Sequence, residues 1–386
     1  MRHALSGYRR FWPVLVVFVV LTGVLTLELK PYDFRLTAVF HMDARTATGN
    51  PMPKDFVILS IPSYDGAQYY QVARNIPRVV NPGRWEELRH RNPGSYAYQR
   101  FLLPLLAYLV SFGNAFLLPF AFVGINMLAL LGVALLLLKN GVKPLYAITL
   151  ALCPAAMLAM HFTLAEPLTM LLIAFTLLRY RRNGSFGPWE IVALSLAVLA
   201  REVNILFVLY LLGWSALKLR WKDAARLLVP AAVFTGFHAV LYGIFGNIPF
   251  FTSTGARQFP GSAAFDLIIG RSGYDAMSFS SLALIALFVL PGIVFTLHDI
   301  WKRRDVDVLS LGALAFFCLM LIMPKYIWGS ITSIGRVITP VYPLTVLLLA
   351  SRDSAITRKL ATGILLLGLV TGIGLALIVH PFTLAP

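Results

Sequence analysis

The sequence is poor in charged residues, especially acidic ones, and almost free of cysteine. Only 17 of its 386 residues are Asp or Glu, and charged residues make up 13%, whereas hydrophobic residues make up 58%. Soluble domains average about 25% charged residues, so this composition excludes an ordinary soluble protein and indicates a membrane protein. Cys153 and Cys318 each stand in an apolar run far from any metal-ligand spacing. A disulfide framework and a cysteine zinc site are therefore not indicated, and we expect both cysteines to be small core residues.

Internal repeats, heptad runs and low-complexity tracts are also lacking, which disfavours a transporter assembled from inverted repeats. Residues 1 to 30 have a basic start and an apolar stretch, as a signal peptide would. No small-residue cleavage site follows, so we expect this stretch to be retained as a helix.

Apolar runs long enough to cross a bilayer recur along the chain. A membrane-spanning helix needs roughly 20 apolar residues, because its backbone groups must be satisfied within the segment. The sequence predicts an all-α polytopic membrane protein, a single transmembrane domain over residues 1–386 with about eleven spans. These lie near residues 11–28, 118–138, 144–161, 164–180, 188–200, 203–219, 225–245, 281–298, 308–323, 336–350 and 358–380.

The basic residues favour one orientation of the chain. With the N-terminus inside and residues 100–113 lying along the interface, more than half of the 33 Lys and Arg fall in short inner segments, as the positive-inside rule requires. The formal net charge of +16 is scattered in clusters between the spans. It fits contact with anionic membrane lipids, and no nucleic-acid partner is expected.

Most acidic residues then fall on the outer side, so the chemistry is expected to face outward. Two long outer segments remain, residues 29–117 with juxtamembrane helices and residues 246–280. We expect both to pack on the bundle. The second suits a mobile lid or an acceptor-recognition element, since loops of this length are often functional. It carries Arg257, Asp266, Arg271 and Asp275.

The polar stretch SYDGAQYYQVARNIP, residues 63–77, places a carboxylate among tyrosines. We expect a short helix capped by Ser63, with Asp65 in its first turn, Tyr69 on the same face and Pro77 limiting its extension. The helix dipole favours the ionised form of Asp65. A first-turn stabiliser is the plain alternative to a functional role.

The order of first span, outer-loop Asp with aromatics and juxtamembrane helix resembles the GT-C superfamily of integral-membrane glycosyltransferases. The likeness is to the branch that contains the second mannosyltransferase of GPI-anchor synthesis and its bacterial relatives. An aromatic-Asp-small motif followed by an aromatic pair corresponds to Tyr64, Asp65, Gly66, Tyr69 and Tyr70. The branch has Trp in place of Tyr64, and its later aromatic-Phe-Pro signature is replaced by YAYQRFLLPLL. The acceptor therefore cannot be carried over.

The resemblance implies a GT-C-like bundle with outer juxtamembrane helices in the bacterial inner membrane, active on its periplasmic or outer side. It implies inverting transfer of a sugar, a hexose such as mannose, from a polyprenyl-phosphate donor to an unidentified acceptor hydroxyl. No cofactor is expected. Asp65 would be the catalytic base, with Tyr64 and Tyr69 beside the substrate. Such a reaction needs a carboxylate to accept the hydroxyl proton and cations to hold the departing phosphate.

Cations on the outer side are few. Arg336 stands in ITSIGRVITPVYP, and Lys325 stands in PKYIWGS just before it. An ionisable residue at a span boundary is a functional candidate, although snorkelling to the interface also explains it. The planar guanidinium fork favours Arg336 for phosphate binding.

Five further residues near the outer ends of spans are candidate substrate contacts. Glu166 could meet Arg201, while the adjacent Glu202 points elsewhere, and an ion pair that locks helix ends remains as open as substrate binding. His161 is equally consistent with a packing role, and no cluster at ligand spacing supports a metal site. Arg100 either touches a lipid phosphate or anchors at the headgroups, and we favour the anchor.

Two other functional classes remain open. A transporter or flippase for a lipid-linked or small polar solute would place charges near the middle of spans and break its helices in matching halves. A non-catalytic membrane scaffold predicts that Asp65, Arg336 and Glu166 do not converge.

Overall fold

A computed structural model describes residues 11–48, 50, 52–60, 63–90, 93–248, 290–303, 307–321, 336 and 338–378. Within these residues the protein is all-α, apart from a two-residue parallel pairing of β1 (Met42–Asp43) with β2 (Ile58–Leu59). Lys325 lies outside the described residues, as do most of the second outer loop and its four charged residues, Arg257, Asp266, Arg271 and Asp275.

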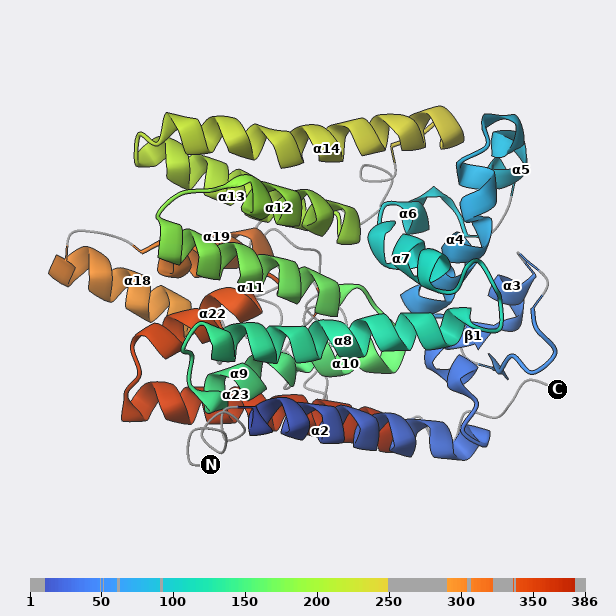
Figure 1. The fold of residues 1–386 in the computed structure, drawn as a ribbon, viewed down its shortest axis with the longest axis horizontal. Helices are drawn as coiled ribbons and strands as arrows, with labels where there is room; N and C mark the ends of the chain where they lie inside the picture. The colour runs from blue at the N-terminus through green and yellow to red at the C-terminus, as the bar shows by residue number, and fades with distance from the viewer. Residues whose placement is uncertain are drawn as a thin grey trace, which may run out of the picture.

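The helices of the main bundle run alongside one another, with α14 on one side and α2 and α23 on the other (Figure 1). They are α2 (Trp12–Leu29), α8 (Leu118–Lys139), α9 (Pro144–Ala151), α10 (Pro154–Phe162), α11 (Glu166–Asn183), α12 (Pro188–Ala200), α13 (Asn204–Leu217), α14 (Trp221–Phe245), α18 (Leu290–Arg303), α19 (Val308–Leu321), α22 (Val341–Ser351) and α23 (Ala355–Ile378).

The elements between α2 and α8 gather at one end of this bundle, at the right of Figure 1. They are η1 (Lys30–Tyr32), η2 (Leu36–Phe40), α3 (Ala44–Ala47), α4 (Asp65–Val79), η3 (Pro82–Arg84), α5 (Trp85–Arg89), α6 (Ser95–Tyr98) and α7 (Leu102–Val110). At nine residues, α7 is too short to cross a bilayer.

The prediction of about eleven spans is wrong. Among the described residues, five segments are long and apolar enough to cross a membrane: Trp12–Tyr32, Leu118–Lys139, Pro144–Phe162, Trp221–Phe245 and Ala355–Leu377. Three other apolar helices, α12, α13 and α22, have 13, 14 and 11 residues. At 1.5 Å per residue they reach only about 17–21 Å, against a hydrocarbon core of about 30 Å. The predicted spans 188–200 and 203–219 agree with α12 and α13 to within two residues at each end, so the error lay in counting helices this short as spans.

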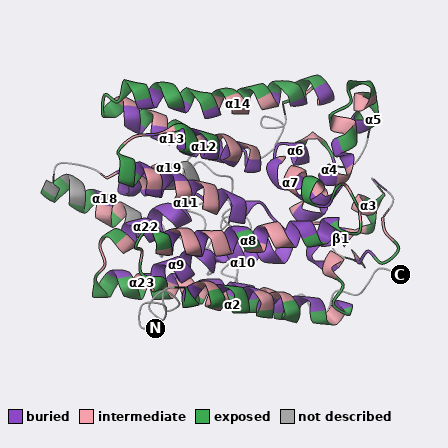
Figure 2. Ribbon diagram, viewed as in Figure 1, coloured by how far each residue is buried: buried purple, intermediate pink, exposed green. Residues whose placement is uncertain are grey.

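The centre of the bundle is formed by α9 and α10. In the most apolar part of Pro144–Phe162, 89% of the residues are buried, against 28% in that of Trp221–Phe245. Figure 2 shows the exposed outer faces of α14 and α2. The helical structure is interrupted at Leu152 and Cys153, because Pro154 cannot continue the preceding helix but suits the start of the next. Gly368 of α23 packs against this break, where an added Cβ would lie 1.9 Å from the Leu152 carbonyl oxygen.

Two predictions about single residues are wrong. Cys153 is buried as expected, but Cys318 of α19 is exposed. Ser63 does not cap α4. Its hydroxyl donates to Asp43 Oδ1 at 2.7 Å instead, and the cap position is occupied by Tyr64, whose side chain does not cap the helix. Pro77 lies within α4, which ends two residues later.

The elements between α2 and α8, called the outer segment below, are held to the bundle by polar contacts as well as packing. Arg89 Nε of α5 donates to the Ile244 carbonyl oxygen at the end of α14, at 2.6 Å. Within the segment, Asn75 Nδ2 of α4 donates to the Tyr98 hydroxyl of α6 at 2.9 Å. The first bond joins α5 to α14, and the second joins α4 to α6.

Candidate functional site

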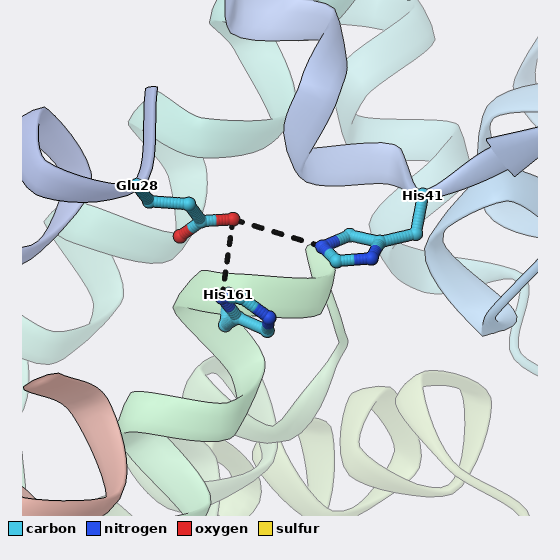
Figure 3. A group of neighbouring side chains, drawn as sticks. All are labelled: Glu28, His41 and His161. Atoms are coloured by element: carbon cyan, nitrogen blue, oxygen red, sulfur yellow. Dashed lines mark ion pairs between the residues drawn. The ribbon is translucent and has the colours of Figure 1, made fainter. Parts of the chain in front are cut away.

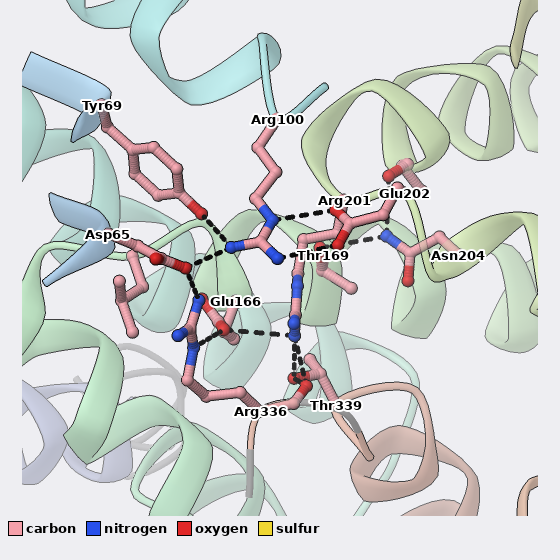
Figure 4. A network of polar contacts seen from close by, with 12 residues as sticks. Asp65, Tyr69, Arg100, Glu166, Thr169, Arg201, Glu202, Asn204, Arg336 and Thr339 are labelled. Carbon is pink, nitrogen blue, oxygen red and sulfur yellow. Dashed lines mark hydrogen bonds and ion pairs between the residues drawn. The ribbon is translucent and has the colours of Figure 1, made fainter. Parts of the chain in front are cut away.

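Six charged side chains from distant parts of the sequence meet beneath the outer segment (Figure 4). Each lies at a helix start or in a link between elements: the first residues of α4 and α11, the α6–α7 and α12–α13 links, and the turn before α22. Three are acidic and three are basic, so the formal charges balance. We call them the ionic cluster: Asp65, Arg100, Glu166, Arg201, Glu202 and Arg336.

Asp65 bridges two of the arginines. Its Oδ2 accepts a hydrogen bond from Arg336 Nη2 at 2.6 Å and another from Arg100 Nη1. The next residue, Gly66, allows α4 to begin against the end of α10, because a Cβ there would lie 2.0 Å from the Phe162 carbonyl oxygen. The side chain of Asp65 remains 20% exposed. The carboxylate is therefore within reach of a small group entering the site.

Arg100 is held on three sides. Its Nε and Nη2 donate to the two carboxylate oxygens of Glu202 at 2.8 and 2.7 Å. Its Nη2 also donates to the Tyr96 hydroxyl at 2.6 Å, and its Nη1 to the Tyr69 hydroxyl at 3.3 Å. Arg100 is only 4% exposed. The interpretation of Arg100 as a headgroup anchor is therefore wrong, because its buried guanidinium group is bonded to protein side chains.

Glu166 links the other two arginines. Its Oε1 accepts from Arg336 Nε at 2.7 Å and lies 3.1 Å from Arg201 Nη1. The expected contact between Glu166 and Arg201 is thus present. Arg201 also donates to the Thr339 hydroxyl at 3.2 Å. Arg336 is buried, so snorkelling to the interface does not explain it.

The electrostatics of the ionic cluster keep its carboxylates ionised. Burial alone would raise the pKa of Asp65, but the guanidinium groups of Arg336 and Arg100 hold that pKa well below its usual value. Burial would likewise raise the pKa of Glu202, but the guanidinium group of Arg100 lowers it, and the net pKa is lowered. Burial raises the pKa of Tyr69, which therefore stays a neutral phenol.

The aromatic residues named from the sequence lie beside the ionic cluster. The Arg336 guanidinium carbon is 5.1 Å from the centroid of the Tyr64 ring, a cation–π distance. Tyr64 stacks on Phe162, with ring centroids 4.1 Å apart. Sequence reasoning missed Tyr96 and Thr339. Both are uncharged and common in such segments, so no pattern singled them out.

His161 does not belong to the ionic cluster. It lies with Glu28 and His41 in a second buried group, the Glu-His-His cluster (Figure 3). Spacing could not reveal this group, because its members come from three separate segments. One signal was available, since Glu28 is an ionisable residue in an apolar span, and such residues are functional candidates.

Comparison of the chain with protein-family profiles, curated proteins and solved structures gave no match. Any assignment of function therefore depends on the residues and geometry described above.

Proposed function

We propose that this chain is a GT-C-type glycosyltransferase of the bacterial inner membrane. It would move a sugar, a hexose such as mannose, from a polyprenyl-phosphate donor to an acceptor hydroxyl at the outer face, with inversion. The observation that carries the proposal is the contact of Asp65, partly accessible, with the buried guanidinium groups of Arg336 and Arg100. A scaffold would not require Asp65, Arg336 and Glu166 to converge, and they do converge.

The chemistry needs a base and an anion site close together. Asp65 takes the proton of the acceptor hydroxyl as the hydroxyl oxygen forms a bond to the anomeric carbon. The bond from that carbon to the phosphate oxygen breaks, and the lipid phosphate leaves with the electron pair. Arginine forks suit the phosphate oxygens and stabilise the charge that develops on them.

Donor binding would also change Asp65 itself. Arg336 and Arg100 both point at its Oδ2 (Figure 4), and an arriving phosphate competes for the same donors. Partial withdrawal of either guanidinium raises the pKa of Asp65 toward the range in which a carboxylate is a useful base. Phosphate binding and activation of the base are thereby coupled.

The alternative is a transporter or flippase. The break between α9 and α10 is the feature that favours it, since transporters bind substrates at interrupted helices. The break is formed by Leu152 and Cys153, which are buried and uncharged. The charged groups lie instead at the ends of helices beneath the outer segment, which suits surface chemistry better than passage through the midplane.

The test uses the purified full chain in liposomes, a panel of polyprenyl-phosphate sugars and a membrane lipid extract as acceptor. We expect Asp65→Asn to lower turnover by about 100- to 10,000-fold, the usual contribution of general-base catalysis. The control is Asp55→Asn, because Asp55 is an exposed carboxylate of the same segment, and it should leave turnover unchanged. Equal turnover by Asp65→Asn and the unchanged chain would rule out the base assignment.

A further inference from the structure

The Glu-His-His cluster joins three parts of the fold that are distant in sequence. Glu28 lies in the last turn of α2, His41 follows η2, and His161 lies in the last turn of α10. Their exposed fractions are 4%, 3% and 1%. Figure 3 shows one carboxylate oxygen of Glu28 directed at both imidazole rings. The glycosyl-transfer chemistry proposed above uses none of these residues.

The atoms of this group have the spacing of metal ligands. Glu28 Oε1 lies 3.2 Å from His161 Nδ1 and 3.8 Å from His41 Nε2. One ligand atom from each residue can be chosen so that all three lie within 4.8 Å of one another. A tetrahedral zinc ion, with bonds of about 2.0–2.1 Å, holds its ligand atoms about 3.4 Å apart. The distance from Glu28 to His161 is already close to this value, and a small movement of His41 toward Glu28 would bring the second distance to it.

The buried polar atoms of the cluster also lack hydrogen bonds. Among the described residues, no hydrogen bond satisfies Glu28 Oε1, His41 Nδ1 or either ring nitrogen of His161. Buried polar atoms are nearly always paired, and an unpaired one costs about 1–3 kcal/mol. Glu28 Oε1 keeps ionic contacts with both rings, but His41 Nδ1 and His161 Nε2 have no partner among the described residues. The imidazole groups are therefore only partly satisfied.

The backbone at His41 gives a second indication. His41 has φ 48°, in the left-handed region, which is uncommon for residues other than glycine although His adopts it more often than most. Such conformations persist where the surrounding structure imposes them, and they gather at ligand clamps. Here the conformation brings the imidazole of His41 next to that of His161, with ring centroids 4.7 Å apart.

We propose that Glu28, His41 and His161 bind one divalent transition-metal ion, with zinc as the expected ion. Two imidazoles and one carboxylate suit zinc and its neighbours in the first transition row. Magnesium and calcium prefer sites made of oxygen atoms. Three protein ligands leave a fourth position for water or another small ligand.

The ion would stabilise the aromatic residues that lie next to Asp65. Phe162 contacts both imidazoles, with ring centroids 4.8 Å from His41 and 4.5 Å from His161. The same ring stacks on Tyr64, which precedes Asp65. By joining α2, α10 and the outer segment, the ion would hold this aromatic stack in place. It is a positioning element and does not itself contact the ionic cluster.

The test measures metal binding directly, so it is independent of any transferase assay. The full chain, stripped with a chelator and returned to metal-free buffer, is titrated with Zn²⁺, and bound zinc is counted by mass spectrometry. We expect one ion per chain. Co²⁺ added in place of Zn²⁺ should give the intense visible absorption of a four-coordinate site. A stripped chain that takes up no stoichiometric zinc would overturn the proposal.

Variants locate the ion. We expect Glu28→Gln and His161→Gln to weaken zinc binding by at least about tenfold, since each removes a ligand. The matched controls are Glu190→Gln and His238→Gln, which change a buried carboxylate and a buried imidazole elsewhere in the bundle. These should bind zinc as the unchanged chain does. Zinc binding that survives in Glu28→Gln and His161→Gln would place the ion elsewhere and contradict the assignment.

Discussion

The two buried polar clusters differ in how their charges are satisfied. In the ionic cluster every carboxylate contacts at least one guanidinium group, and three acidic side chains face three basic ones. In the Glu-His-His cluster one carboxylate faces two imidazoles without hydrogen bonds that satisfy them. The first cluster is balanced in charge, although Glu166 Oε2 and Arg201 Nε have no hydrogen-bond partner among the described residues, and a phosphate must compete with its carboxylates for the arginines. The second contains one carboxylate and no Lys or Arg, so a cation can add to it.

The largest effect on stability should come from breaking the ionic cluster. Arg100→Gln leaves Glu202 buried without its bidentate partner, and removal of one member of a buried ion pair typically lowers the free energy of unfolding by about 3–5 kcal/mol. Denaturation in detergent micelles would measure this loss. Arg84→Gln, which removes an arginine from the exposed pair with Glu87, serves as the control and should have no measurable effect. Equal losses in the two variants would show that the ionic cluster contributes nothing beyond a surface pair.

Adding a zinc ion to the Glu-His-His cluster should stabilise the folded chain. Free Zn²⁺ at a hundred times its dissociation constant should raise the free energy of unfolding by about 2.7 kcal/mol, because the ion binds the folded chain. The increase should vanish in His161→Gln and persist in His238→Gln and Arg100→Gln. Thermal unfolding with and without Zn²⁺ measures it. An equal increase in His161→Gln would break the distinction between the two clusters.

The pH dependence of the ionic cluster should give the smallest effect. Because the arginines lower the pKa of Asp65, its ion pairs stabilise the fold above the ordinary value of 3.8, and this stability is lost as the pH falls below it. The free energy of unfolding should differ between the unchanged chain and Asp65→Asn by about 1.5–3 kcal/mol at neutral pH. The difference should stay constant down to about pH 5 and shrink below about pH 4. A difference that grows in acid would have the wrong sign for a lowered pKa.

Much of the ionic cluster could be identified in advance from where its residues stand. Asp65 begins a helix in a polar stretch, and Glu166, Arg201, Glu202 and Arg336 each border an apolar run. A charge at such a border is costly to bury and therefore draws attention. Arg100 was named but misinterpreted, because its location beside an interfacial helix equally suits a lipid headgroup. Nothing in the local sequence showed that Glu202 would lie opposite it.

Composition and hydropathy by themselves predicted a helical membrane protein, because apolar segments must satisfy their own backbone groups in lipid. Within the described residues the chain is all-α, with five segments long and apolar enough to cross a membrane. The tertiary structure decided how many helices are long enough to cross, since α12, α13 and α22 have only 13, 14 and 11 residues. It also decided the membership of both clusters. Glu28, His41 and His161 carry no common spacing, and only the packing of α2, α10 and the outer segment brings their side chains into one dry site where an unpaired polar atom is costly.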